Sequence, residues 1–243
     1  MEHYVWICLI FFFAAFTQGV SGFGSSLVAM PLLTLIIPVK TAVPLCMVNG
    51  LFITIYLSFK LKEHFDWSKI LPLFLASLPG VLIGVYILKK AAPDIMKMVL
   101  GCLIIAYCLF RFLRRGRLGQ TMRIKAVWGW LAGFVSGVIS ASISAGGPPV
   151  VIYTTMTNWH KEAITSTLSV FFFLSGVVVV VSHALSGFTT VEVLRMDIIS
   201  APVALLGVVG GSACYARIDR GTYLRVMYGL LVVSGLFLIY SAV

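Results

Sequence analysis

The sequence predicts an all-α polytopic membrane protein, with two inverted-topology repeats that each hold a broken helix pair followed by three spanning helices. Composition gives the class: 60% of the residues are hydrophobic and 11% are charged, against about half and about a quarter in soluble domains. Several apolar runs reach the roughly 20 residues that a spanning helix needs. The two longest are interrupted by Gly, Ser and Pro at 19–31 and 135–149, as in transporters whose helices break at membrane depth.

The first half begins with a broken apolar run over residues 4–37, interrupted after Gly19. Uninterrupted apolar runs follow over 41–59, 70–88 and 95–113. Each is long enough to cross the hydrocarbon core once. We therefore expect residues 1–113 to form the first membrane repeat.

The second half has the same order. A broken run covers 126–157, and spans are expected over 163–184, 198–215 and 223–240. Pro79 and Gly84 of the first half correspond to Pro202 and Gly207 of the second, which favours an internal repeat of roughly 120 residues. We expect residues 126–243 to form the second repeat and 114–125 a basic cytoplasmic loop between them.

The basic residues indicate how the chain crosses the membrane, because Lys and Arg are enriched in cytoplasmic loops. Their bias is strongest if each broken run folds into two helices and returns to the side where it began. This arrangement inverts the second repeat and places both termini outside. Two helices of about 15 residues would each rise only ~23 Å, short of the ~30 Å hydrocarbon core, so we expect them to meet near mid-membrane.

Other features exclude several classes of function. The net charge of +10 resides in short loops between apolar runs, so nucleic-acid binding is not predicted. The five cysteines form no CxxC pair, so we expect neither a disulfide, a metal nor a cofactor. Every acidic residue is expected in a loop or near a span end, and His183 is expected in the interfacial region. No buried carboxylate relay for protons is therefore predicted, and coupling of anion export to an ion is optional. We expect glycines spaced by four to pack helices closely, and Phe171–Phe173 to face lipid or pack.

The two breaks are the predicted binding site. A helix that starts at a break presents unpaired N–H groups and the positive end of its dipole, which attract an anion without a formal cation. Serines can instead cap their own backbone, and Gln18 or Asn49 can instead form an interhelical hydrogen bond. The candidate substrate-binding residues are Gln18, Ser21, Gly22, Gly24, Ser25, Ser26, Asn49, Ser136, Ser140, Ser144, Gly146, Gly147 and Pro148.

The Gly19-x-Ser-Gly-Phe-Gly24 stretch running to Pro31, its repeat ending at Gly146-Gly147-Pro148-Pro149, and the helices of Pro79 and Pro202 resemble the sulfite exporter TauE/SafE family. The family is also called the toluene-sulfonate uptake permease group. The resemblance implies movement of sulfite or small organosulfonate anions across a bacterial inner membrane, with no enzymatic activity. Ser25-Ser26 stands where the family often has further glycines, which implies a bulkier or more strongly hydrogen-bonded anion.

Two alternatives and one assembly state accompany this hypothesis. Gly19-Val20-Ser21-Gly22 matches the GxSG pattern of rhomboid-like intramembrane serine proteases, with His183 as the base. A second Ser136-Gly137 at what we interpret as the equivalent position argues against a single catalytic serine. A passive anion channel is the other alternative. Membrane lipid surrounds the chain, and a homodimer is plausible for one so small.

Overall fold

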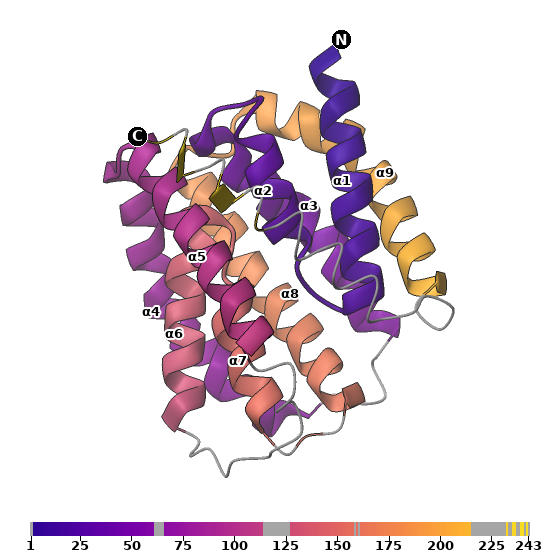
Figure 1. The fold of residues 1–243 in the computed structure, drawn as a ribbon, viewed down its shortest axis with the longest axis vertical. Helices are drawn as coiled ribbons and strands as arrows, with labels where there is room; N and C mark the ends of the chain where they lie inside the picture. Colours follow the sequence, from indigo (N-terminus) through magenta and orange to yellow (C-terminus); the bar gives the residue numbers. More distant parts are fainter. Residues whose placement is uncertain are drawn as a thin grey trace.

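The computed structural model describes residues 2–60, 66–113, 127–157, 159, 161–214 and scattered positions from 232 onward. Within these ranges the chain is helical, as predicted (Figure 1). The loop expected at 114–125 and most of the span expected at 223–240 lie outside the described residues. The helices are α1 (Glu2–Ser21), α2 (Ser25–Leu33), α3 (Val39–Lys60), α4 (Trp67–Lys90), α5 (Pro93–Leu113), α6 (Val127–Ile143), α7 (Gly147–Met156), α8 (Lys161–Leu185) and α9 (Val191–Cys214).

Six of the described helices are long and apolar enough to cross a membrane, namely α1, α3, α4, α5, α8 and α9. The chain is therefore a multi-pass membrane protein. The expected spans agree with these helices except at one boundary: α9 begins at Val191 rather than near residue 198. The earlier start brings the polar segment around Asp197 into the helix.

Both broken runs consist of two helices, as predicted, but the prediction of two helices of about 15 residues each was wrong. The first run divides into 20 residues in α1 and 9 in α2, and the second into 17 in α6 and 10 in α7. Each short helix packs against the longer helix before it. The division is unequal because the chain turns at Gly22–Gly24 and at Ser144–Gly146, beyond the midpoint of each run.

The first helix of each half packs along the fourth helix of the other half (Figure 1). α1 lies beside α9, α6 lies beside α4, and α3 and α8 cross between these pairs. A Cβ at Gly211 of α9 would overlap the Phe16 carbonyl oxygen of α1, and one at Gly133 of α6 would overlap that of Leu73 in α4. The predicted close packing at spaced glycines is confirmed. The other glycines in these two contacts are Gly19, Gly80, Gly84, Gly137 and Gly207.

The same packing, of a first helix against the fourth helix of the other half, occurs twice, which agrees with an internal repeat. The inverted relation of the repeats and their boundaries at 113 and 126 stay predictions. The largest buried cluster contains residues of α1, α2, α3, α5 and α9, together with Leu88 of α4 and with Ile143 and Ala145 beside the second break. The core therefore extends across both halves of the sequence.

Candidate functional site

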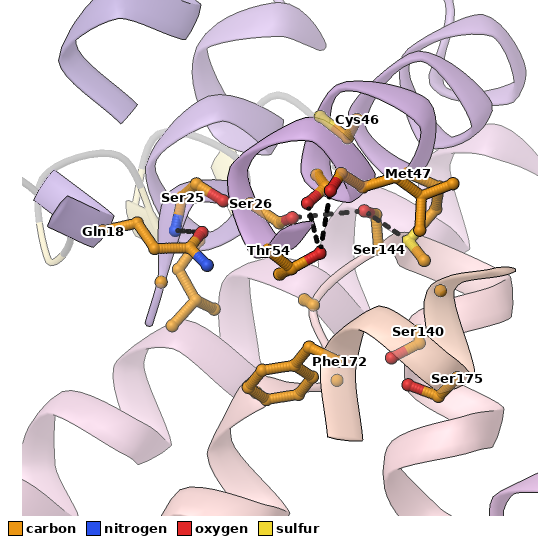
Figure 2. A pocket seen from close by; sticks show the side chains of 18 residues that line it. Gln18, Ser25, Ser26, Cys46, Met47, Thr54, Ser140, Ser144, Phe172 and Ser175 are labelled. Atoms are coloured by element: carbon orange, nitrogen blue, oxygen red, sulfur yellow. Dashed lines mark hydrogen bonds between the residues drawn. The ribbon is translucent and has the colours of Figure 1, made fainter. Parts of the chain in front are cut away.

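Both breaks meet at one pocket, which has a cavity volume of about 70 Å³ (Figure 2). Its lining comes from the end of α1, the start of α2, the end of α6, the start of α7, and the middle of α3 and α8. Eight of the thirteen candidate residues line it: Gln18, Gly24, Ser25, Ser26, Ser140, Ser144, Gly146 and Gly147. The structure thus brings the two breaks together, although they are more than 100 residues apart in the sequence.

At the first break, Gly24 sets the direction in which α2 starts. Its φ of 100° lies in the left-handed region, which glycine enters without the penalty of other residues. α2 then begins with Ser25, and its first intrahelical bond is donated by the Val28 N–H to the Gly24 oxygen at 3.3 Å. The Ser25 N–H donates to Oε1 of Gln18 at 3.3 Å. The N-terminus of α2 therefore opens at the pocket with Ser25 and Ser26 in its first turn.

The second break is built differently. Ser144 has a φ of 55° and is the one non-glycine residue with a positive φ in the described part of the chain. Gly146 precedes α7, and Pro148 and Pro149 occupy its first turn. Prolines have no N–H, so the start of α7 offers fewer donors than the start of α2. Strained backbone of this kind concentrates at functional sites.

Inside the pocket, one contact connects the two breaks and another connects the second break to α3 (Figure 2). The Ser144 hydroxyl lies 3.4 Å from Oγ of Ser26 and 3.1 Å from Sδ of Met47 on α3. Ser144 therefore contacts both the α2 N-terminus and the α3 wall. A ligand between the breaks would compete with these contacts for the same hydroxyls.

The walls from α3 and α8 were not predicted from the sequence. α3 contributes Gly50 and Thr54, one turn apart, and α8 contributes Phe172 and Ser175. A Cβ at Gly50 would have nothing within 4 Å, so this glycine faces open space. Phe172 packs against the buried cluster around Phe171, as expected, and it also lines the pocket, which was not expected. The sequence signal was weak, because Gly50 and Thr54 of α3 are small or polar and one turn apart, a pattern that ordinary spans also have. The remaining lining residues are Leu27, Cys46, Met47, Leu51, Ala145 and Gly176.

Among the described residues, none that lines this pocket carries a formal charge. Its polar groups are hydroxyls, the Gln18 amide and backbone groups at two helix starts. Hydroxyl and N–H donors together with a helix N-terminus stabilise an anion. The pocket can therefore hold an anion by hydrogen bonds and dipoles alone.

The other five candidate residues lie outside this lining. The Ser21 hydroxyl donates to the backbone oxygens of Thr17 at 2.7 Å and Phe23 at 2.5 Å, so it caps its own backbone. Ser136 donates to the Gly146 oxygen at 2.6 Å and fixes the second break from within α6. Gly22 turns the chain with a φ of 84°, Pro148 starts α7, and Asn49 bonds to α9.

The equivalence of Ser21 and Ser136 was wrong. Ser21 is the last residue of α1, whereas Ser136 lies seven residues before the end of α6. That is about two helical turns, so the serines occupy different levels of their helices. Ser136 therefore does not speak against a protease. The hydrogen bonds of Ser21 and His183 do, because they occupy the groups that catalysis would need. The Ser21 hydroxyl is used by backbone oxygens, and the His183 ring bonds to the Ala141 oxygen at 2.9 Å.

One expectation about the acidic residues was also wrong. Asp197 is not in a loop but inside α9, with 4% of its surface exposed. His183 is in the last turn of α8, at a span end as expected, and its side chain has no exposed surface. Asp197 is buried because Asn49 of α3 donates to it. Of the two roles considered for Asn49, the structure shows the interhelical hydrogen bond, and Asn49 lies outside the pocket lining.

All five cysteines are free. Within the described residues no group of three His, Cys, Asp or Glu side chains is placed to hold a metal ion.

Six helices long enough to span, broken helix pairs and a polar, uncharged pocket between the breaks define a multi-pass membrane protein of the transporter class. The family model described as "Sulfite exporter TauE/SafE" matches residues 7–238. The chain belongs to this family, so it is a membrane transporter, and the bacterial inner membrane is its expected location. No curated protein and no solved structure matches it.

Proposed function

We propose that this protein is a secondary transporter, and by default an exporter, of sulfite or a small organosulfonate anion. The anion binds between the two breaks and reaches each side of the membrane in turn. The observation that carries the proposal is a pocket that both breaks line, with hydroxyl and backbone donors and no charged side chain among its described residues. The hydroxyls of Ser25, Ser26 and Ser144 and the backbone of Gly146 and Gly147 are the proposed contacts.

The electrostatics of the pocket favour a transporter over a tight anion binder. A bidentate contact from Arg would hold the anion strongly, whereas helix dipoles and hydroxyls contribute smaller amounts individually. A site of this kind can bind and release within one cycle. A negative interior drives an anion outward by about 2.3 kcal/mol per charge per 100 mV, which supports export as the default direction.

The size of the pocket supports a small substrate. A water-sized sphere needs at least about 10–15 Å³, so a cavity of about 70 Å³ has room for roughly five to seven of them. Sulfite has four non-hydrogen atoms and fits this space, whereas an aromatic sulfonate has more than ten. We therefore expect sulfite and the shortest sulfonates to be preferred over toluene sulfonate.

The direct test is transport by the purified protein in liposomes. Sulfite, sulfate, thiosulfate, taurine, sulfoacetate and toluene sulfonate would be compared, with and without an imposed membrane potential. We expect saturable, potential-driven flux of a small sulfur oxyanion, with counterflow. Flux of none of these anions would refute the proposal, and flux that neither saturates nor shows counterflow would identify a channel.

A matched pair of glycine variants tests whether this pocket carries the flux. Gly50→Ala adds a methyl group in open space in the pocket, whereas Gly210→Ala adds one in α9, where the Cβ meets only the Phe16 ring at 3.8 Å. One methyl group in a binding pocket changes specificity by about 10–200-fold. We expect Gly50→Ala to lower kcat/KM at least about tenfold and Gly210→Ala to leave it unchanged. Equal rates in both variants would place the substrate elsewhere.

A further inference from the structure

A buried carboxyl group lies between α3 and α9, outside the pocket lining. Asn49 Nδ2 donates to Oδ1 of Asp197 at 2.5 Å and to Oγ of Ser200 at 3.1 Å. Asn49 and Ser200 have no exposed surface, and Asp197 has 4%. Asn49 is the eleventh of 22 residues in α3, and both helices are candidate spans. The group is therefore at membrane depth, where ionisable side chains are costly and commonly functional.

No described cation neutralises this carboxyl group. Ser200 donates its own hydroxyl to the Met196 oxygen at 2.8 Å, which leaves the Asn49 amide as the donor to Asp197. α9 packs mainly on α1 and α3, and their described titratable groups have other neighbours. Cys8 lies 3.8 Å from the Ile199 oxygen, Cys46 lines the pocket, and Tyr4 packs against the apolar core. Tyr56 bonds to Ser212, Lys40 donates to the Lys89 oxygen, Lys60 lies over the Tyr56 ring, and His3, Glu192 and Arg195 are exposed.

An unpaired buried carboxylate costs several kcal/mol, and the group avoids this cost by taking up a proton. Asn49 is suited to both protonation states because its amide carries donors and an acceptor. Its Nδ2 donates to the carboxylate. Its Oδ1 is buried without a partner and is available to accept from the O–H of a protonated carboxyl group. A buried acceptor that stays unpaired costs about 1–3 kcal/mol, so protonation of Asp197 offers it a partner.

The carboxyl group is connected to the pocket through α3. Met47 and Gly50 on this helix line the pocket, and Asn49, between them in sequence, points to α9. A change in the bond between Asn49 and Asp197 therefore acts on the same helix turn that forms the pocket wall. Ser144 of the second break also contacts Met47, at 3.1 Å.

We propose that Asp197 is a proton-binding site that couples anion transport to the proton gradient, with Asn49 as the group that positions it in both protonation states. This proposal rests on the proposed transport function. The proton moves reversibly between water and the carboxyl oxygen, and no other bond is made or broken. A single buried carboxyl group is sufficient for this role, so no relay is required.

The first experiment detects the proton without reference to any substrate. Infrared difference spectra of the purified protein, recorded between pH 5 and 9, report the C=O stretch of protonated carboxyl groups. We expect a band that titrates in the wild type, is absent in Asp197→Asn, and is kept at a shifted frequency in Asp197→Glu. Absence of a titrating band in the wild type, or its survival in Asp197→Asn, would overturn the proposal.

Asp66→Asn is the matched control for this spectrum. Asp66 precedes α4 outside the spans and is ionised over the whole range, because the Ser68 hydroxyl and N–H that bond to it lower its pKa. Its removal should leave the titrating band unchanged. Loss of the band in Asp66→Asn would show that the titrating proton belongs to Asp66 rather than to Asp197, and would overturn the proposal.

The second experiment measures coupling in liposomes with the membrane potential clamped at zero. The probe is thiosulfate or sulfoacetate, whichever the protein carries, since neither changes its charge between pH 6 and 8. One pH unit corresponds to a factor of ten in an equilibrium constant, so a one-unit gradient should produce an accumulation of about tenfold per proton in the wild type and in Asp66→Asn. Asp197→Asn should retain counterflow and reach a ratio of about one.

The outcomes separate this proposal from the transport function. A ratio of one in the wild type, or a ratio that follows a Na⁺ gradient and ignores pH, would overturn proton coupling and leave transport standing. Failure to carry any anion would refute the proposed function and, with it, the coupling, whereas the infrared titration would still decide whether Asp197 binds a proton.

Discussion

The two breaks have similar places in their halves and different chemistry. The first turns on two glycines with positive φ, Gly22 and Gly24, and leads into a helix whose first turn contains Ser25 and Ser26. The second turns on Ser144, and the first turn of its helix contains Pro148 and Pro149. Prolines remove N–H donors, so α2 has the better anion-binding N-terminus and α7 the more rigid one.

The comparison indicates that the two breaks contribute differently to the pocket. The first break supplies donors to the pocket, and the second supplies a rigid corner whose Ser144 hydroxyl reaches across to Ser26. Ser136 strengthens that corner by donating to the Gly146 oxygen. Substitutions at matched positions should therefore affect binding at the first break and folding at the second.

The largest expected difference lies between the break glycines. In Gly146→Ala the new Cβ would overlap Oγ of Ser140 and the Ser136 carbonyl oxygen, whereas in Gly24→Ala it would meet nothing within 4 Å. Overpacking against backbone costs about 3 kcal/mol, and the positive φ of residue 24 costs Ala about 1–2 kcal/mol. Thermal unfolding in detergent should show Gly146→Ala as the less stable variant. A lower stability of Gly24→Ala would contradict the proposal that the second break is rigid and the first is open.

The serines of the two breaks give the next largest effect. Hydrogen bonds to a charged group contribute about 1.5–3 kcal/mol, so Ser26→Ala should raise KM for the transported anion at least about tenfold. Ser140→Ala, beside the corner of the second break, should raise it less. KM from initial rates in liposomes measures both. A larger increase in KM for Ser140→Ala would show that the main hydrogen-bond donor to the anion lies at the second break.

A pair of substitutions at Ser144 separates its hydroxyl from its backbone. Ser144→Gly and Ser144→Ala both remove the contacts to Ser26 and Met47, but only glycine relieves the φ of 55°. Glycine should be the more stable by about 1 kcal/mol, with equal losses of transport in the two variants. Unequal transport at equal stability would show that the backbone conformation, rather than the hydroxyl, serves the substrate.

Features encoded locally in the sequence could be predicted, and features that depend on a partner helix could not. Breaks are visible as Gly, Ser and Pro within apolar runs, and close helix packing is visible as glycines spaced by four. The burial of Asp197 depends on Asn49, which is 148 residues away. One signal was available, because Asp197 shares the buried face of α9 with Val193, Ser200 and Ala204, at the spacing of one helical stripe.

The pocket walls illustrate the same limit. Gly50 and Thr54 look like ordinary span residues until α3 is placed beside the breaks. The positions of Ser21 and Ser136 along their helices were likewise predicted wrongly, because a short Gly/Ser motif can recur by chance in a sequence rich in these residues. The position of the helix ends relative to the turns, rather than the motif, determines which residues correspond.

The glycine contacts between α1 and α9 and between α4 and α6 have a consequence for synthesis. Backbone-to-backbone packing of α1 requires Gly207 and Gly211, which leave the ribosome nearly 200 residues later. Until then α1 can insert into the bilayer but has no partner for its tightest contact. The first half alone is therefore an incomplete fold. A nascent chain interrupted before α9 leaves the backbone face of α1 around Phe12 and Phe16 open to contact with other membrane helices.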